Sequence, residues 1–197
     1  MKLVITSCAD DLLWRHSRLA AVADALPAAA ARAVNKTLQG LRTDVVREVR
    51  GRYNVPAKDV RGTMSIRKAW KHNAEGVLRI RAARSVPLVR FGALPRTPKV
   101  KRPRKGAPGV SVKVLSSGGR KPLRRVFVAR MRSGHVGVYE RASGVRALPI
   151  RELHGPSFVP YLYRDDVHER VTDMATDRLW KHLDHEAGRE LKKAGLS

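Results

Sequence analysis

Apolar residues at helical spacing predict two helices within residues 9–54. The first covers residues 9–25, where two aspartates near its start suit the positive end of a helix dipole. Pro27 then predicts a break and a restart of the helix. From residue 28 to about 53 the apolar side chains form one stripe, made by Val34, Leu38, Leu41, Val45 and Val49. Such a stripe packs on the core of its own chain, which is the usual case, or on a neighbouring subunit.

A C-terminal helix is predicted over residues 164–193. Asp165 and Asp166 open it and Lys192 and Lys193 close it, so each charge lies at the helix end whose dipole it complements. Between these ends, apolar residues recur every three or four positions along one side. The other side carries mixed charges and is expected to be solvated.

Between these helical regions the pattern changes to the alternation of β-strands. After a short basic helix near residues 58–63, strand patterns occur at residues 75–83, 86–92, 109–117 and 124–144. The second is edge-like because it contains Pro87. The last reads as two strands joined by a turn at Ser133 and Gly134. We therefore predict an antiparallel sheet of about five strands over residues 75–145, with arginine or lysine on its open face.

Together these elements predict an α+β fold in a single domain over residues 1–197, in which the sheet packs with the long N-terminal and C-terminal helices. Residues 148–162 are expected to form an irregular connection, because prolines and a glycine interrupt them. Residues 95–109, PRTPKVKRPRKGAPG, predict a flexible, extended basic loop, since their prolines and like charges oppose compact structure. The loop's candidate residues for contact with a partner protein or DNA are Arg96, Lys99, Lys101, Arg102, Arg104 and Lys105.

The charge of the chain narrows its possible partners. Its formal net charge is +24, and residues 61–151, with 24 basic and 2 acidic side chains, carry most of it. Such a surface attracts phosphate backbones, acidic protein faces or anionic lipid. Nonspecific DNA binding follows from charge alone and weakens with salt, and the sequence has no helix-turn-helix, zinc-finger or RNA-recognition signature. The single Cys8 favours a reducing compartment, and no apolar run is long enough for a membrane helix.

Candidate catalytic and metal-binding residues are few. His182, His185 and Glu186 have a helical spacing that can hold zinc, but no matching cluster of ligands occurs elsewhere. Glu152 and His154 resemble part of a hydrolase site, yet no nucleophile motif accompanies them. Phosphate-binding and dinucleotide-binding loops are also missing from the sequence. We therefore predict no enzymatic activity, metal site or cofactor.

Several motifs in the same order resemble the minor tail protein Z family of bacteriophages and prophages. The strongest is LPIRELHGPS, residues 148–157, preceded by FVARM and SGHVGVYER at residues 127–141. Upstream, ALPAAAARAVNKTLQGLRTDVVREV is similar to the family's N-terminal helix, and VLRIRAARSVPLVRFGA to its first pair of strands. The resemblance covers roughly residues 20–190.

The resemblance implies a structural protein, a tail completion or head-tail connector subunit that acts late in tail assembly. It further implies a homo-oligomeric ring of six copies, contacts with the tail tube and with terminator or neck proteins, possible contact with the packaged DNA end, and no membrane partner. Glu152 and His154 are then residues of a structured connection. The motif residues expected to have structural roles are Phe127, Arg130, Met131, Gly134, His135, Gly137, Leu148, Pro149, Ile150, Glu152, Leu153, Gly155, Pro156 and Ser157. The alternative is a nonspecific DNA-binding protein that uses its basic sheet and loop.

Overall fold

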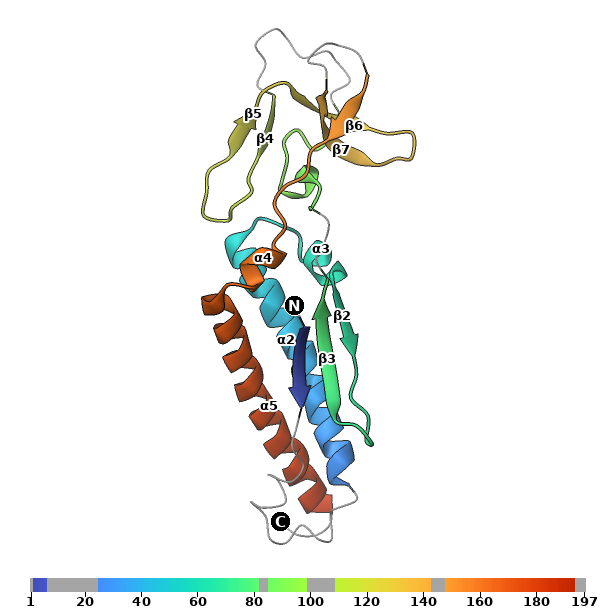
Figure 1. Cartoon of the computed structure of the whole chain (residues 1–197), viewed down its shortest axis with the longest axis vertical. Coiled ribbons are helices and arrows are strands. Elements are labelled where there is room, and N and C mark those ends of the chain that lie inside the picture. Colours follow the sequence, from blue (N-terminus) through green and yellow to red (C-terminus); the bar gives the residue numbers. More distant parts are fainter. Residues whose placement is uncertain (1, 7–24, 82–84, 99–108, 143–147, 194–197) are drawn as a thin grey trace. The chain divides into compact units, whose positions relative to one another are not determined.

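The computed structural model consists of two compact units, each with its own helices and strands (Figure 1). The structure describes residues 2–6, 25–81, 85–98, 109–142 and 148–193. Unit 1 comprises residues 1–46, 61–81 and 159–197, and unit 2 comprises residues 47–60 and 82–158. The predicted mixture of long terminal helices and antiparallel strands is confirmed. The single-domain organisation stays a prediction.

Helix α2, Leu26–Arg52, confirms the predicted stripe. All five apolar residues of the stripe are fully buried: Val34, Leu38, Leu41, Val45 and Val49. Pro27 is the second residue of the helix, a position at which a missing backbone N–H removes no helical hydrogen bond. The helix predicted at residues 9–25 lies, apart from Ala25, outside the described residues.

A three-stranded antiparallel sheet of unit 1 packs on α2. Its order is β1–β3–β2, with β1 at Lys2–Thr6, β2 at Met64–Arg67 and β3 at Glu75–Ile80. A Cβ atom at Gly76 would lie 2.5 Å from Leu38 Cδ1 and 2.7 Å from Val34 Cγ1, so β3 lies directly against the buried side of α2. Of these strands, only β3 was predicted from the sequence.

Helix α5, Asp165–Lys193, confirms the predicted C-terminal helix and packs on α2. Small side chains permit a close approach, since Ala30 and Ala33 of α2 contact Leu183 and Ala187 of α5 in one buried cluster. Two carboxylates of α5 are also buried in this contact. Glu186 accepts hydrogen bonds from Arg32 Nε at 2.7 Å and Lys36 Nζ at 2.6 Å, and Arg32 also bonds Glu190. A second ion pair joins Arg178 of α5 to the buried Asp44 of α2 at 2.7 Å.

Unit 2 contains two further antiparallel sheets. One pairs β4, Val110–Val112, with β5, Lys121–Leu123, and the other has the order β6–β7–β8. The strands of the second sheet are β6, Val126–Arg130, β7, Val136–Arg141, and β8, Ile150–Glu152. The turn predicted at Ser133 and Gly134 joins β6 to β7 and is confirmed. The predicted short helix is α3, Ala57–Gly62.

The structure corrects three details of the predicted fold. The strands form three small sheets instead of one of about five. Residues 86–92 form no strand but a single turn of 3₁₀-helix, η2, Leu88–Arg90, because Pro87 has no N–H to donate to a ladder and its carbonyl instead accepts from Arg90 N. Residues 148–162 are more regular than expected, since they form β8 and the short helix α4, Val159–Leu162. Pro149 precedes β8 and therefore interrupts none of its hydrogen bonds.

Candidate functional site

The β6–β7–β8 sheet brings together most of the motif residues. At its hairpin, Met131 N donates to the carbonyl of His135, and Gly134 N donates to the carbonyl of Met131. Gly134 has a φ of +80°, a backbone conformation that favours glycine. Arg130, at the end of β6, is exposed and its backbone pairs with Val136. The hairpin is thus shaped by backbone geometry, and its charged side chains are left available for contacts.

The side chain of Glu152 is held by His135, the residue just before β7, and not by His154. Its Oε1 lies 2.8 Å from Nε2 of His135, while Nδ1 of His154 is 3.3 Å from the backbone oxygen of Glu152. Gly137 leaves room for this pair, because a Cβ atom there would lie 2.6 Å from Glu152 Oε1 and 3.0 Å from the Tyr139 ring. Burial, and secondarily the charge of Glu152, raise the pKa of Tyr139. The carboxylate therefore has a partner that fixes its position in the sheet.

The connection after β8 ties this sheet to the segment around η2. Leu153 N donates to Val138 O, and Leu153 O accepts from Leu88 N, both within 2.9 Å. Gly155 N donates to Val86 O at 2.8 Å. Gly155 is buried against the ring of Phe91, whose side chain is fully inaccessible, and a Cβ atom there would lie 2.8 Å from Phe91 Cδ2. These contacts explain why a motif that looks irregular in sequence has a defined path.

Aromatic and exposed apolar residues complete the motif region. Phe127 of β6 and Tyr139 of β7 have ring centroids 6.3 Å apart. The guanidinium of Arg141 lies 5.2 Å from the Phe127 centroid, a cation–π contact that sequence reasoning missed.

Leu148 is 77% exposed. An apolar side chain this exposed next to a fixed connection can contact a partner protein. The remaining motif residues, Pro149, Ile150, Pro156 and Ser157, lie in or beside β8 and its connection.

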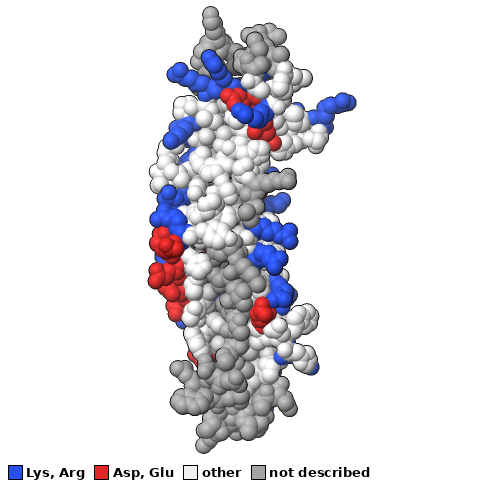
Figure 2. All heavy atoms as spheres, viewed as in Figure 1, with Lys and Arg blue, Asp and Glu red and all other residues white. Residues whose placement is uncertain are grey.

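Arg96 is the one loop candidate within the described residues, and it is exposed. The other five lie outside the described residues: Lys99, Lys101, Arg102, Arg104 and Lys105. Figure 2 shows that basic side chains are nevertheless numerous on both units. In unit 2 the exposed ones include Lys121, Arg124, Arg125, Arg130 and Arg132, and in unit 1 Arg67 and Arg79 lie on β2 and β3.

The candidate zinc-binding residues do not gather around a common point. Glu186 faces α2, where it bonds Arg32 and Lys36. Burial raises the pKa of Glu186, but the hydrogen bonds from Lys36 and Arg32 and the charges of Lys36 and Arg189 outweigh burial and lower its pKa to about 2. Within the described ranges, no three His, Cys, Asp or Glu side chains form a metal-binding group. Glu186 instead forms ion pairs with cations from two helices.

None of the described helices is both long and apolar enough to cross a membrane. Several motif residues bond one another or pack on buried rings, and the exposed ones include a cation, Arg130, and a large apolar side chain, Leu148. Contacts with charged or apolar surfaces of other macromolecules are the chemistry that such groups perform.

Comparison with known proteins identifies the family. The family model described as prophage minor tail protein Z (GPZ) matches residues 18–194. No curated protein and no solved structure matches the chain. The matched range contains α2, α5 and all the motif residues named above, so the match spans both units. The family is one of structural proteins of the phage tail. The chain therefore belongs to the prophage minor tail protein Z family.

Proposed function

We propose that this chain is a tail completion subunit, a connector that assembles as a ring at the head-proximal end of the tail and makes head-tail joining competent. The observation that carries the proposal is the family match over residues 18–194. In this role the chain is a structural component and catalyses no reaction. Its partners are further copies of itself, six in the ring, together with the tail tube and the terminator or neck proteins.

The geometry of the motif region supports a role in assembly. Its glycines and its His135–Glu152 pair fix the shape of the β6–β7–β8 sheet, and the exposed Arg130 and Leu148 lie at the end of β6 and just before β8. A rigid scaffold that presents a few exposed groups is suited to binding because little conformational freedom is lost on association. The protein would be made in the host cytoplasm and remain in the virion at the head-tail junction.

The location of the chain in the particle tests this proposal. Intact particles are labelled with gold-conjugated antibodies against the chain and viewed by electron microscopy. We expect label at the junction of head and tail. Label confined to the distal tip of the tail, or particles that contain none of the chain, would contradict the proposed position. Particles that carry an unrelated tail serve as the control for nonspecific label.

Substitutions in the basic loop test whether the connector contacts a partner protein or the packaged DNA. Replacing its six basic residues with serine removes six positive charges, and we expect a loss of head-tail joining or of DNA retention in the particle. We favour joining, since extended interaction segments often become ordered on assembly. A matched variant exchanges each lysine for arginine and each arginine for lysine, which keeps the charge. Full infectivity of the serine variant would exclude both roles.

A second candidate function rests on charge alone: a nonspecific DNA-binding protein whose basic surface in residues 61–151 is its working face. This DNA-binding function requires the free chain to bind duplex DNA at physiological salt and to act outside the particle. Affinity measured over a range of salt concentrations distinguishes the two candidates, because purely electrostatic binding falls steeply as salt rises.

A further inference from the structure

The face of β2 and β3 that points away from α2 carries exposed basic side chains beside the buried Val77. Gly76 faces α2, so in an alternating strand Val77 and Arg79 point to the opposite face. The register pairs Ser65 with Arg79 and Arg67 with Val77, which places these β2 residues on the same face. A hollow of about 270 Å³ lies there, lined by Ser65, Ile66, Arg67, Val77 and Arg79.

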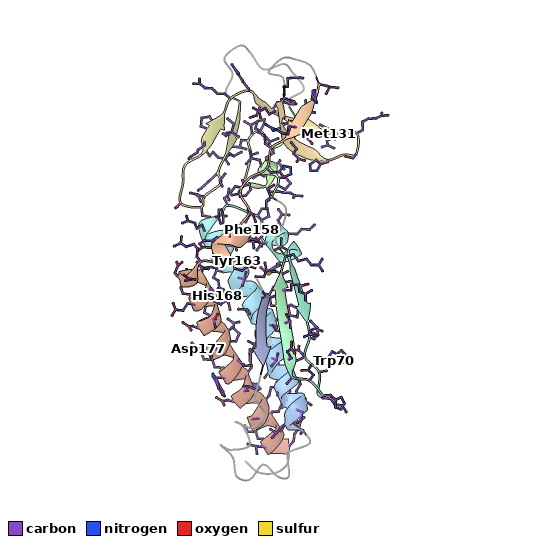
Figure 3. The ribbon with its side chains drawn as sticks, viewed as in Figure 1. Trp70, Met131, Phe158, Tyr163, His168 and Asp177 are labelled. Carbon is purple, nitrogen blue, oxygen red and sulfur yellow. The ribbon has the colours of Figure 1, made fainter. Side chains whose placement is uncertain are left out.

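The charges of this surface are largely unpaired within the described chain. Residues 64–81 contain five basic side chains and a single acid, Glu75, which pairs with Arg67 at 2.6 Å. The other four are exposed and form no ion pair with any described residue: Lys68, Lys71, Arg79 and Arg81. We call these five cations the basic strand face, although Lys68 and Lys71 lie in the connection between β2 and β3. Between two of its lysines, Trp70 projects from the β2–β3 connection and is 74% exposed (Figure 3).

The same unit carries an acidic surface on α5. Glu169, Asp173 and Asp177 follow one another at four-residue intervals, so they lie on one side of the helix. All three are exposed and form no ion pair with a described residue. Asp165 and Asp166 precede them, and the partly exposed Trp180 lies one turn beyond. We call Glu169, Asp173 and Asp177 the acidic helix face. It is an exception in a chain with a net charge of +24.

We propose that the basic strand face of one copy binds the acidic helix face of a second copy of this chain. The two faces are complementary in sign, and each has an exposed tryptophan that can serve as an apolar anchor. In Figures 2 and 3 they lie on opposite sides of unit 1, with Trp70 on one side and Asp177 on the other. A contact between opposite sides of identical subunits is heterologous, and it generates a ring when the rotation between subunits closes and an open filament when it does not.

Nucleic acid is the competing occupant of the basic strand face. A phosphate backbone would neutralise the cations but would leave the acidic helix face without a partner. A second copy satisfies both faces with one contact, and this complementarity favours a second copy as the occupant. Only the closure of this contact into a ring rests on the proposed function. The pairing of the two faces can be measured with the purified chain alone.

Charge reversal on each face tests the pairing. The helix variant carries Glu169→Lys, Asp173→Lys and Asp177→Lys, and the strand variant carries Lys68→Glu, Arg79→Glu and Arg81→Glu. We expect wild-type chains to self-associate at low ionic strength, as measured by sedimentation velocity, and each variant to associate at least about tenfold more weakly. An equimolar mixture of the two variants should associate again, because each then presents the charge that the other lacks.

Controls distinguish the loss of charge complementarity from misfolding and from a loss of DNA binding. A variant with Lys121→Glu, Arg124→Glu and Arg132→Glu has the same change of charge on unit 2 and should associate like wild type. If circular dichroism shows that the strand variant is altered, Lys68→Glu with Lys71→Glu outside the strands replaces it. A monomeric wild type, or variants that associate like wild type, would overturn the proposal. So would a strand variant that loses only duplex DNA binding. None of these results depends on where the protein acts in the particle.

Discussion

Gly155→Ala is expected to destabilise unit 2 by about 3 kcal/mol, the upper part of the range for overpacked buried sites. The new methyl group would overlap the ring of Phe91, and this ring cannot move aside freely because it is fully buried. Gly155 N also donates to Val86 O, so a backbone shift that relieves the overlap would weaken this hydrogen bond. The consequence is a loosened connection between β8 and the η2 segment.

Hydrogen exchange measured by mass spectrometry is the suitable readout, because all three tryptophans belong to unit 1 and their fluorescence would not report on unit 2. Peptides that cover β6–β8 and η2 should lose protection in Gly155→Ala. The matched control is Gly119→Ala in the same unit, where a Cβ atom has no neighbour within 4 Å and no positive φ applies. Equal protection in both variants would contradict the close packing of Gly155 on Phe91.

Glu186→Gln is expected to remove an acid-sensitive part of the stability of unit 1. The folded pKa of Glu186 is about 2 and its ordinary value is 4.5, so between these values the unfolded chain binds more protons than the native chain. The contribution of Glu186 is therefore complete above pH 4.5 and is lost as the pH falls toward 2. It amounts to at most about 3 kcal/mol at neutral pH.

Urea unfolding followed by tryptophan fluorescence measures this contribution, since all three tryptophans belong to unit 1 and Trp180 lies on the same helix as Glu186. Wild type should be more stable than Glu186→Gln at pH 7, and the difference should shrink on acidification. Other carboxylates titrate in the same range, since the pKa of Glu190 is also lowered: burial raises it, but Lys193, Arg32 and Arg189 outweigh that effect. The difference between the two chains isolates Glu186. Glu169→Gln, exposed on the same helix, should match wild type. A difference in the free energy of unfolding that does not depend on pH would contradict the lowered pKa of Glu186.

Helical periodicity was the strongest structural signal in the sequence. α2 and α5 repeat their apolar pattern over many turns, and their buried sides depend only on that repeat. The short strands were harder to predict. β1 and β2 have five and four residues, and they become strands because both pair with β3. β8 was missed because Pro149 and the glycine and prolines after it mask a strand that is defined by β7.

The motif residues were found by resemblance, and their physical roles required the fold. Nothing local in the sequence indicates that Gly155 packs on Phe91 or that Glu152 pairs with His135, because these partners are distant along the chain. Glu186 illustrates the opposite case. Its spacing to His182 and His185 suggested a metal site, whereas its position on the side of α5 that meets α2 gives it two cationic partners. A helical face can be read from sequence, but the neighbour that covers it cannot.

Electron microscopy of a lysate from the parent phage or prophage with this gene deleted tests the central claim most directly, together with a titre of infectious particles. Tail completion predicts separate filled heads and tails, or joined particles that do not infect, and recovery when the wild-type gene is supplied. Normal, fully infectious particles in the deletion lysate would contradict a role at the head-tail junction.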